Sequence, residues 1–121
     1  QEQRHQQLKI MVEAVVGAFV DAKMRRPDIS LALYSVASEL GGDALTRKFG
    51  KRGRSALSSM LETAPGVRFE QVQFTAMMLF AAMASATRAV LEAGATAKTV
   101  RLLRSELVLL CHGYLAFSGA P

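Results

Sequence analysis

Residues 97–118 read AKTVRLLRSELVLLCHGYLAFS, and the fold can be worked out from this stretch. Its apolar residues follow one another at alternating steps of three and four, which is typical of a helix packed lengthwise against another helix. These residues are Val100, Leu103, Leu107, Leu110, Tyr114 and Phe117. A second apolar set lies beside or behind them, so one contact surface cannot cover this helix. That set is Leu102, Val108, Leu109, Cys111 and Leu115.

The preceding segment, about 69 to 93, also carries two separate sets of apolar residues. One stripe consists of Phe69, Val72, Ala76, Leu79, Met83, Ala86 and Val90. Elsewhere around the helix are Phe74, Met77, Met78, Phe80 and Ala81. A helix that is apolar all round must be buried all round, and a chain of this size cannot easily enclose two such helices. We therefore expect a homodimer. Its predicted interface includes Leu79, Met83, Ala86, Val90, Val100, Leu103, Leu107, Leu110 and Tyr114.

The rest of the chain also shows only helical periodicity. Apolar residues from Leu8 to Val20 recur at helical steps and predict a helix from about 4 to 24. Pro27 fits the first turn of a second helix that ends at Gly41-Gly42. Its predicted buried stripe is Ile29, Leu33, Val36 and Leu40. A third helix from about 43 carries Leu45, Phe49, Leu57, Met60 and Leu61 on one face, with Gly50 and Gly53 as unfavourable residues inside it. The sequence thus predicts an all-α, five-helix bundle that forms one domain over residues 1–121.

Composition limits the class of protein. Half of the 121 residues are apolar, which is enough for a core without a disulfide or metal. The single cysteine, Cys111, cannot close an intrachain disulfide, which favours a cytoplasmic protein. The longest nearly apolar stretch, Ala76 to Ala86, is too short to span a membrane, so we expect no membrane association. The chain begins at Gln1 without a methionine, which suggests a fragment of a longer protein.

The net charge of +5 comes from one segment. Five basic residues fall within eight positions that contain no acid, namely Arg47, Lys48, Lys51, Arg52 and Arg54. Of the 15 lysines and arginines, the remaining ten are balanced by 10 acidic residues. We favour a solvated helix face for this cluster, and a patch that contacts phosphates is the alternative.

Residue types that carry catalysis are sparse and scattered. The two histidines, His5 and His112, lie in the first and last predicted helices. Only Cys111 is adjacent to either, and neighbouring positions point to different faces of a helix. Neither a zinc-ligand spacing nor a phosphate-binding glycine loop occurs in the sequence. We therefore predict no catalytic residue, no metal and no cofactor.

A ligand pocket is the sharper hypothesis. Six methionines and six phenylalanines can supply an apolar, adaptable lining. The residues expected to converge on such a pocket are Phe19, Tyr34, Ser38, Met60, Phe74, Met77 and Met78. Tyr34 and Ser38 lie four apart and share a helix face, so their hydroxyls are predicted to orient the ligand. Ordinary core packing is the alternative for each of these residues.

The order and lengths of the predicted helices resemble the C-terminal domain of TetR-family transcriptional regulators. The resemblance covers nearly the whole chain and rests on the segments from Arg26 to Leu40 and from Thr96 to Phe117. It implies an all-α ligand-binding and dimerisation domain, whose last two helices form an intersubunit four-helix bundle. It also implies a helix-turn-helix for operator DNA, expected in an N-terminal domain that this chain lacks.

The sequence therefore favours the regulatory domain of a TetR-like repressor. Its predicted partners are a second copy of the chain, a hydrophobic or amphipathic small-molecule effector, and operator DNA through the separate N-terminal domain. The resemblance assigns the second helix, 27 to 40, to the element that passes the signal to the DNA-binding heads. The alternative is a stand-alone helical dimer that acts as a scaffold or adaptor without a small ligand. Direct nucleic-acid binding through residues 47 to 54 is a third hypothesis.

Overall fold

The computed structural model describes residues 2–39, 43–64 and 66–120, apart from the side chains of residues 2, 4, 37–39, 43–46 and 49. Within these ranges the chain forms five helices: α1 (Glu2–Met24), α2 (Pro27–Glu39), α3 (Asp43–Glu62), α4 (Val72–Glu92) and α5 (Ala97–Ser118). The non-helical pairing in this part is a single antiparallel bridge between Arg68 and Ala120. The all-α fold and the order of the helices predicted from the sequence are confirmed.

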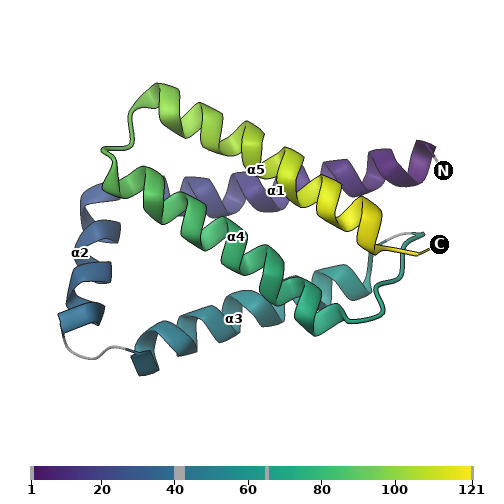
Figure 1. Cartoon of the computed structure of the whole chain (residues 1–121), viewed down its shortest axis with the longest axis horizontal. Helices are drawn as coiled ribbons and strands as arrows, with labels where there is room; N and C mark the ends of the chain where they lie inside the picture. The colour runs from purple at the N-terminus through teal and green to yellow at the C-terminus, as the bar shows by residue number, and fades with distance from the viewer. Residues whose placement is uncertain (1, 40–42, 65, 121) are drawn as a thin grey trace.

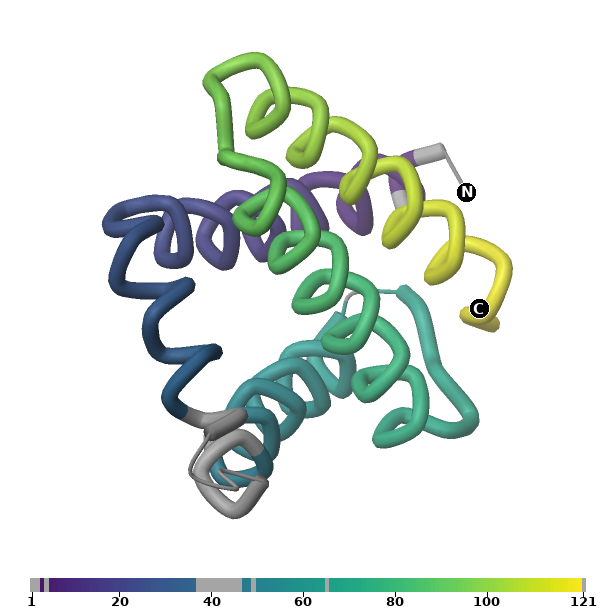
Figure 2. Tube along the Cα trace, turned by 60° about the vertical axis from the view of Figure 1, so that its left-hand side comes forward, coloured from purple at the N-terminus to yellow at the C-terminus, as the bar shows by residue number. Residues whose placement is uncertain are grey.

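Helix α4 lies in the middle of the molecule (Figure 1). The pair α1 and α5 packs on one side of α4, while α3 lies along the other side (Figure 2). The short α2 crosses the end of the bundle and links α1 to α3, at the end opposite to the two chain termini (Figure 1). This order makes α4 the element that contacts all four of the other helices.

Stripes at helical spacing form the core. On α1 the buried residues are Leu8, Val12, Val16 and Val20, as the periodicity predicts. On α5 they are Leu103, Leu107, Cys111 and Leu115, each four residues after the last. Ala76, Leu79 and Met83 of α4 and Leu57 and Leu61 of α3 complete the same cluster. Side chains four apart share one face of a helix, so each stripe presents a continuous apolar surface to its neighbours. An ion pair between Asp21 and Arg104 joins α1 to α5 at the edge of this core.

The loops on either side of α4 have clear local causes. Helix α4 begins at Val72, three residues later than predicted, because backbone bonds tie Arg68 to Ala120 (2.7 and 2.8 Å) and Phe69 is buried within the loop. At the other end, Gly94 adopts a φ of +109°, which favours glycine and lets the chain leave the helix. Thr96 then caps α5 by accepting a hydrogen bond from the backbone N–H of Thr99 (3.2 Å).

Helix α2 packs through a different face from the predicted one. Ser30 donates its hydroxyl to the carbonyl of Lys23 (2.9 Å). The Tyr34 ring lies near two cations, with Lys23 Nζ 5.6 Å and Arg88 Cζ 4.7 Å from its centroid. The predicted buried stripe is wrong, because its members Ile29, Leu33 and Val36 are 44%, 61% and 48% exposed. Its fourth member, Leu40, lies outside the described residues. Apolar and small polar residues alternate in this short helix, so its sequence carries two competing faces.

The glycines inside α3 are explained by close packing against α4. A Cβ added to Gly53 would lie 2.8 Å from Cδ1 of Phe80, so the phenyl ring occupies the space that a side chain would need. Phe80 in turn meets Phe19 of α1 edge to face, with ring centroids 6.1 Å apart. The intrinsic cost of glycine in a helix is therefore offset by the approach of α3 and α4 at this point.

By length and composition, α4 is apolar enough to cross a membrane, and no other helix among the described residues is. The nearly apolar run from Ala76 to Ala86 covers only the middle of this helix, with Gln73 and Arg88 on either side of it. The same composition serves the core of a bundle, because α4 buries Thr75, Ala76, Leu79, Met83, Thr87 and Leu91 against its neighbours. The apolarity of α4 is accordingly explained in part by packing within the chain.

Candidate functional site

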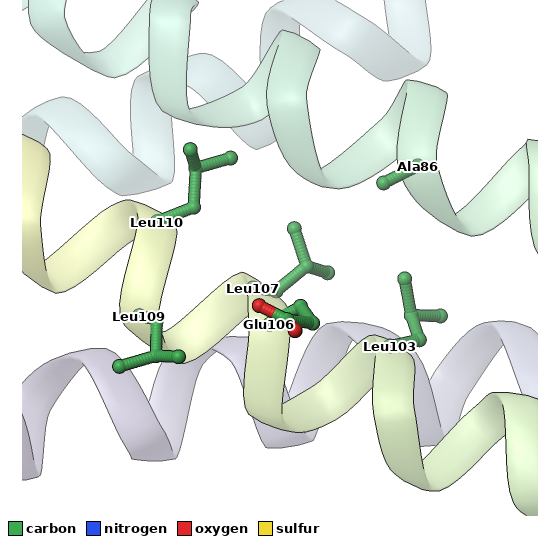
Figure 3. A pocket seen from close by; sticks show the side chains of 6 residues that line it. All are labelled: Ala86, Leu103, Glu106, Leu107, Leu109 and Leu110. Atoms are coloured by element: carbon green, nitrogen blue, oxygen red, sulfur yellow. The ribbon is translucent and has the colours of Figure 1, made fainter.

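An open apolar groove runs between α4 and α5. Its first section, about 420 Å³ in volume, is lined by Ala86 of α4 and by Leu103, Glu106, Leu107, Leu109 and Leu110 of α5. Leu103, Leu107 and Leu110 point from α5 toward α4, with Ala86 opposite them, while Leu109 lies on the side of α5 away from α4 (Figure 3). The small Ala86 side chain leaves space that a larger residue on α4 would fill.

The groove continues toward the C-terminal half of α5. A second section of about 210 Å³ is lined by Met78, Leu79, Ala82, Leu110, Cys111 and Tyr114. Leu110 lines both sections, so together they form one trough along α4 and α5, which we call the α4–α5 trough. Leu110 and Met78 are 57% and 44% exposed at its rim, and Glu106 is the only charged residue in its lining. An exposed apolar surface of this extent is typical of a site that contacts another apolar surface.

The predicted dimer-interface residues fall into two layers of this region. Leu79, Met83, Leu103 and Leu107 are buried in the core of the single chain. Ala86, Val90, Val100 and Tyr114 are partly buried, and Leu110 is exposed. The exposed apolar side chains of α5 also include Leu102, Leu109 and Phe117. Residues at alternating steps of three and four drift slowly around an α-helix, away from the face that contacts α1, because a helical turn contains 3.6 residues. Some members of the stripe therefore lie in the core and others on the surface of α5.

A second open groove, of about 820 Å³, lies between α3 and α4. We call it the α3–α4 groove. Its lining is Lys51, Arg54, Ser55, Ser58, Ser59 and Glu62 of α3 with Gln73, Phe74 and Met77 of α4. Sequence reasoning missed most of this lining. The signal that could have found it is the spacing of Lys51, Ser55, Ser58 and Glu62, which places a polar stripe on one face of a helix.

The predicted ligand-binding residues do not meet in one described cavity. Phe74 and Met77 line the α3–α4 groove, whereas Met78 lines the α4–α5 trough. Phe19 packs against Phe80, Tyr34 lies between Lys23 and Arg88, and Met60 packs against the core. Ser38 is in α2, but its side chain lies outside the described residues. The pattern of Met and Phe therefore located apolar positions without showing which of them face each other.

The titratable groups of the core offer little chemistry. Burial raises the pKa of the Cys111 thiol to about 11, so the thiol stays protonated at neutral pH. Nε2 of His112 and the hydroxyl of Thr87 are buried without a hydrogen-bond partner in the described structure. No three His, Cys, Asp or Glu side chains of the described residues lie together as metal ligands would.

By fold, the described part of the chain is an all-α domain with an exposed apolar trough between its last two helices. The family model described as Tetracyclin repressor-like, C-terminal domain, matches residues 7–115, so the chain belongs to this family. No curated protein and no solved structure matched the sequence. Domains of this family are parts of transcription regulators, which are generally not enzymes. TetR-like domains typically dimerise and bind small-molecule effectors, and TetR-family regulators are soluble cytoplasmic proteins.

Proposed function

We propose that residues 1–121 form the effector-sensing and dimerisation domain of a cytoplasmic TetR-like repressor. Operator binding would belong to a helix-turn-helix in a separate N-terminal domain of the protein. The proposal rests on the α4–α5 trough, which exposes apolar side chains on the last two helices of the chain. The resemblance to TetR-like C-terminal domains implies dimerisation through this pair of helices. In this proposal the domain itself performs no catalysis and needs no metal.

The proposed dimer joins α4 and α5 of each subunit in a four-helix bundle. Leu110, Tyr114, Ala86, Val90 and Val100 would contribute directly, because each keeps exposed surface in the single chain. The buried members of the predicted interface, such as Leu107, would form the layer beneath. Full burial of an exposed leucine side chain is worth about 1.5–3 kcal/mol. Several such residues support an interface above the ~1,000 Å² of a stable biological contact.

Signal transmission in this proposal depends on α2. The helix is attached to α1 and α4 through Ser30 and Tyr34, and it presents Ile29, Leu33 and Val36 outward. In the longer protein this outward face would contact the DNA-binding heads. An effector that binds one arrangement of the helices more tightly shifts the dimer toward that arrangement, in proportion to the difference in affinity.

Sedimentation velocity tests the dimer directly. We expect a dimer at micromolar concentration, and a monomer would refute the proposed bundle. A thermal-shift screen of hydrophobic and amphipathic compounds then separates the sensor from the scaffold alternative. A ligand at a hundred times its dissociation constant stabilises the folded form by about 2.7 kcal/mol. A dimer that no compound stabilises would favour the scaffold.

DNA binding by this chain gives an independent check. The basic cluster on α3 is exposed at Arg47, Lys48, Lys51 and Arg52, which fits a solvated face. We therefore expect only weak, salt-sensitive binding without sequence preference. Sequence-selective, submicromolar binding at physiological salt would instead place the DNA-binding function on α3.

A further inference from the structure

The α3–α4 groove has one polar wall and one largely apolar wall. Along α3 the lining consists of two cations, three serines and a glutamate, whereas α4 supplies Gln73, Phe74 and Met77. Phe74 is 60% exposed and Met77 37% exposed, so the apolar wall faces water in the unliganded chain. Ligand sites combine an apolar lining with a few polar groups that fix orientation, and this groove has both.

The charges in the groove are separated along its length. Lys51 and Arg54 lie toward the middle of α3, while Glu62 is the last residue of that helix. Glu62 lies eleven positions after Lys51 on the helix, which corresponds to about 16 Å. The groove therefore suits an elongated molecule whose anionic end lies at the cations and whose apolar length runs beside Phe74 and Met77.

Arg54 is held where it can receive such an anion. Its Nη1 lies 3.0 Å from the position that a Cβ on Gly50 would occupy, so the guanidinium folds back over the preceding turn of α3. Arg54 is partly buried, and none of the ion pairs among the described side chains involves it or Lys51. A partly desolvated guanidinium without a carboxylate partner favours binding of a carboxylate or a similar anion.

The serines add hydrogen-bonding capacity between the charged and apolar parts. Ser55, Ser58 and Ser59 line the groove, and none of the side-chain hydrogen bonds in the described part of the chain involves them. The α4–α5 trough has no comparable polar wall. Charge and hydroxyls on one wall distinguish this groove from a helix-packing surface.

We infer that the α3–α4 groove binds an elongated amphipathic anion, with its charged end at Lys51 and Arg54 and its apolar tail along Phe74 and Met77. This inference rests on the proposed sensor function, because it names the chemical class of the effector. The expected ligands share an anionic head group on an unbranched apolar chain. Decanoate has both features and is the probe.

Binding can be measured with one introduced reporter. The chain contains no tryptophan, so Phe74→Trp places a single indole in the groove. Decanoate should shift its emission to shorter wavelength and saturate, whereas decanol, which lacks the charge, should bind about tenfold more weakly. Amide shifts of wild-type protein at Ser55, Ser58 and Gln73 provide a second measurement that does not depend on the substitution.

The matched variants are Arg54→Gln and Arg52→Gln, each in the Phe74→Trp background. Both remove one charge from the same basic cluster, but only Arg54 lines the groove. We expect Arg54→Gln to weaken decanoate binding about tenfold and Arg52→Gln to leave it nearly unchanged. Circular dichroism verifies that both variants are folded.

The following results would overturn the assignment. Equal weakening by the two substitutions would show that net charge, and not the groove, attracts decanoate. Amide shifts confined to the α4–α5 trough would place the molecule elsewhere. If another compound stabilises the chain in the thermal screen while decanoate fails to bind, this inference fails and the sensor function stands. If no compound stabilises it, decanoate included, the sensor function fails as well.

Discussion

The two grooves beside α4 differ in what their second wall contains. Met77 faces the α3–α4 groove and Met78 faces the α4–α5 trough, although the two residues are neighbours in the sequence. Beside Met78, α5 contributes Leu110, Cys111 and Tyr114. Beside Met77, α3 contributes cations and hydroxyls. The residues of α4 alone therefore do not define the function of either surface, because the opposing helix decides whether an apolar partner or an amphipathic ligand fits.

The largest expected effect comes from a substitution that disrupts the dimer interface proposed for the α4–α5 trough. Leu110→Glu places a carboxylate at the junction of both sections of the trough, where a dimer would bury it unpaired. An uncompensated buried charge costs about 3–5 kcal/mol, so dimer affinity should fall by a hundredfold or more, measured by sedimentation across protein concentrations. Because Leu110 is exposed in the single chain, the subunit should still fold.

The control for this substitution is Ile10→Glu. Ile10 lies on α1 and is 56% exposed, against 57% for Leu110, so the two changes add the same charge at matched exposure. We expect Ile10→Glu to leave the dimer intact. Equal dissociation constants for the two variants would remove the trough from the interface.

A second pair of substitutions compares a buried residue on the floor of the trough with an exposed residue at its rim. Leu107 is 2% exposed, so Leu107→Ala should lower the free energy of unfolding by about 2–5 kcal/mol in urea titrations at fixed protein concentration. Leu110→Ala should lower the stability of the separated subunit by less than ~1 kcal/mol. A similar loss for both would mean that Leu110 also belongs to the core, contrary to its 57% exposure.

The close approach of α3 and α4 at Gly53 and Phe80 can be tested with glycine substitutions. Gly53→Ala should destabilise the chain by about 1–3 kcal/mol, because the added methyl group overlaps the Phe80 ring. Gly17→Ala is the control, since nothing lies within 4 Å of a Cβ there. That change should stabilise the chain by about 0.5–1 kcal/mol through helix propensity. Thermal unfolding of both variants decides whether the packing contact or propensity dominates at Gly53.

The smallest effect concerns the Cys111 thiol on the trough floor. Its pKa is raised to about 11 by burial, against an ordinary value of 9.0. At pH 8 the folded protein should therefore react with a disulfide reagent about a hundredfold more slowly than the urea-unfolded chain, where more thiolate forms. The raised pKa stabilises the folded state fully below pH 9, and this contribution is lost as the pH rises toward 11. Equal rates in both states would show that the trough floor is open to solvent.

Sequence reasoning worked best where one periodicity dominated. The stripe from Leu8 to Val20 in α1 and the start of α2 at Pro27 were predicted because they depend on neighbours within a few residues. It failed for Ile29, Leu33 and Val36, where an apolar face was assigned to the core although α2 packs through Ser30 and Tyr34. Periodicity reveals that a face is apolar, but it does not reveal which neighbour covers it.

The sequence by itself determined the number and order of the helices within the described residues, because spacing, caps and helix-breaking residues act locally. Tertiary structure alone divided the apolar residues of α4 and α5 between core, trough and groove. It also explained Gly53, whose role depends on Phe80 from another helix, and it brought Lys51 and Arg54 beside Phe74 and Met77. Such pairings depend on how rigid helices cross in space, and residues far apart in the chain acquire their roles only when that crossing is fixed.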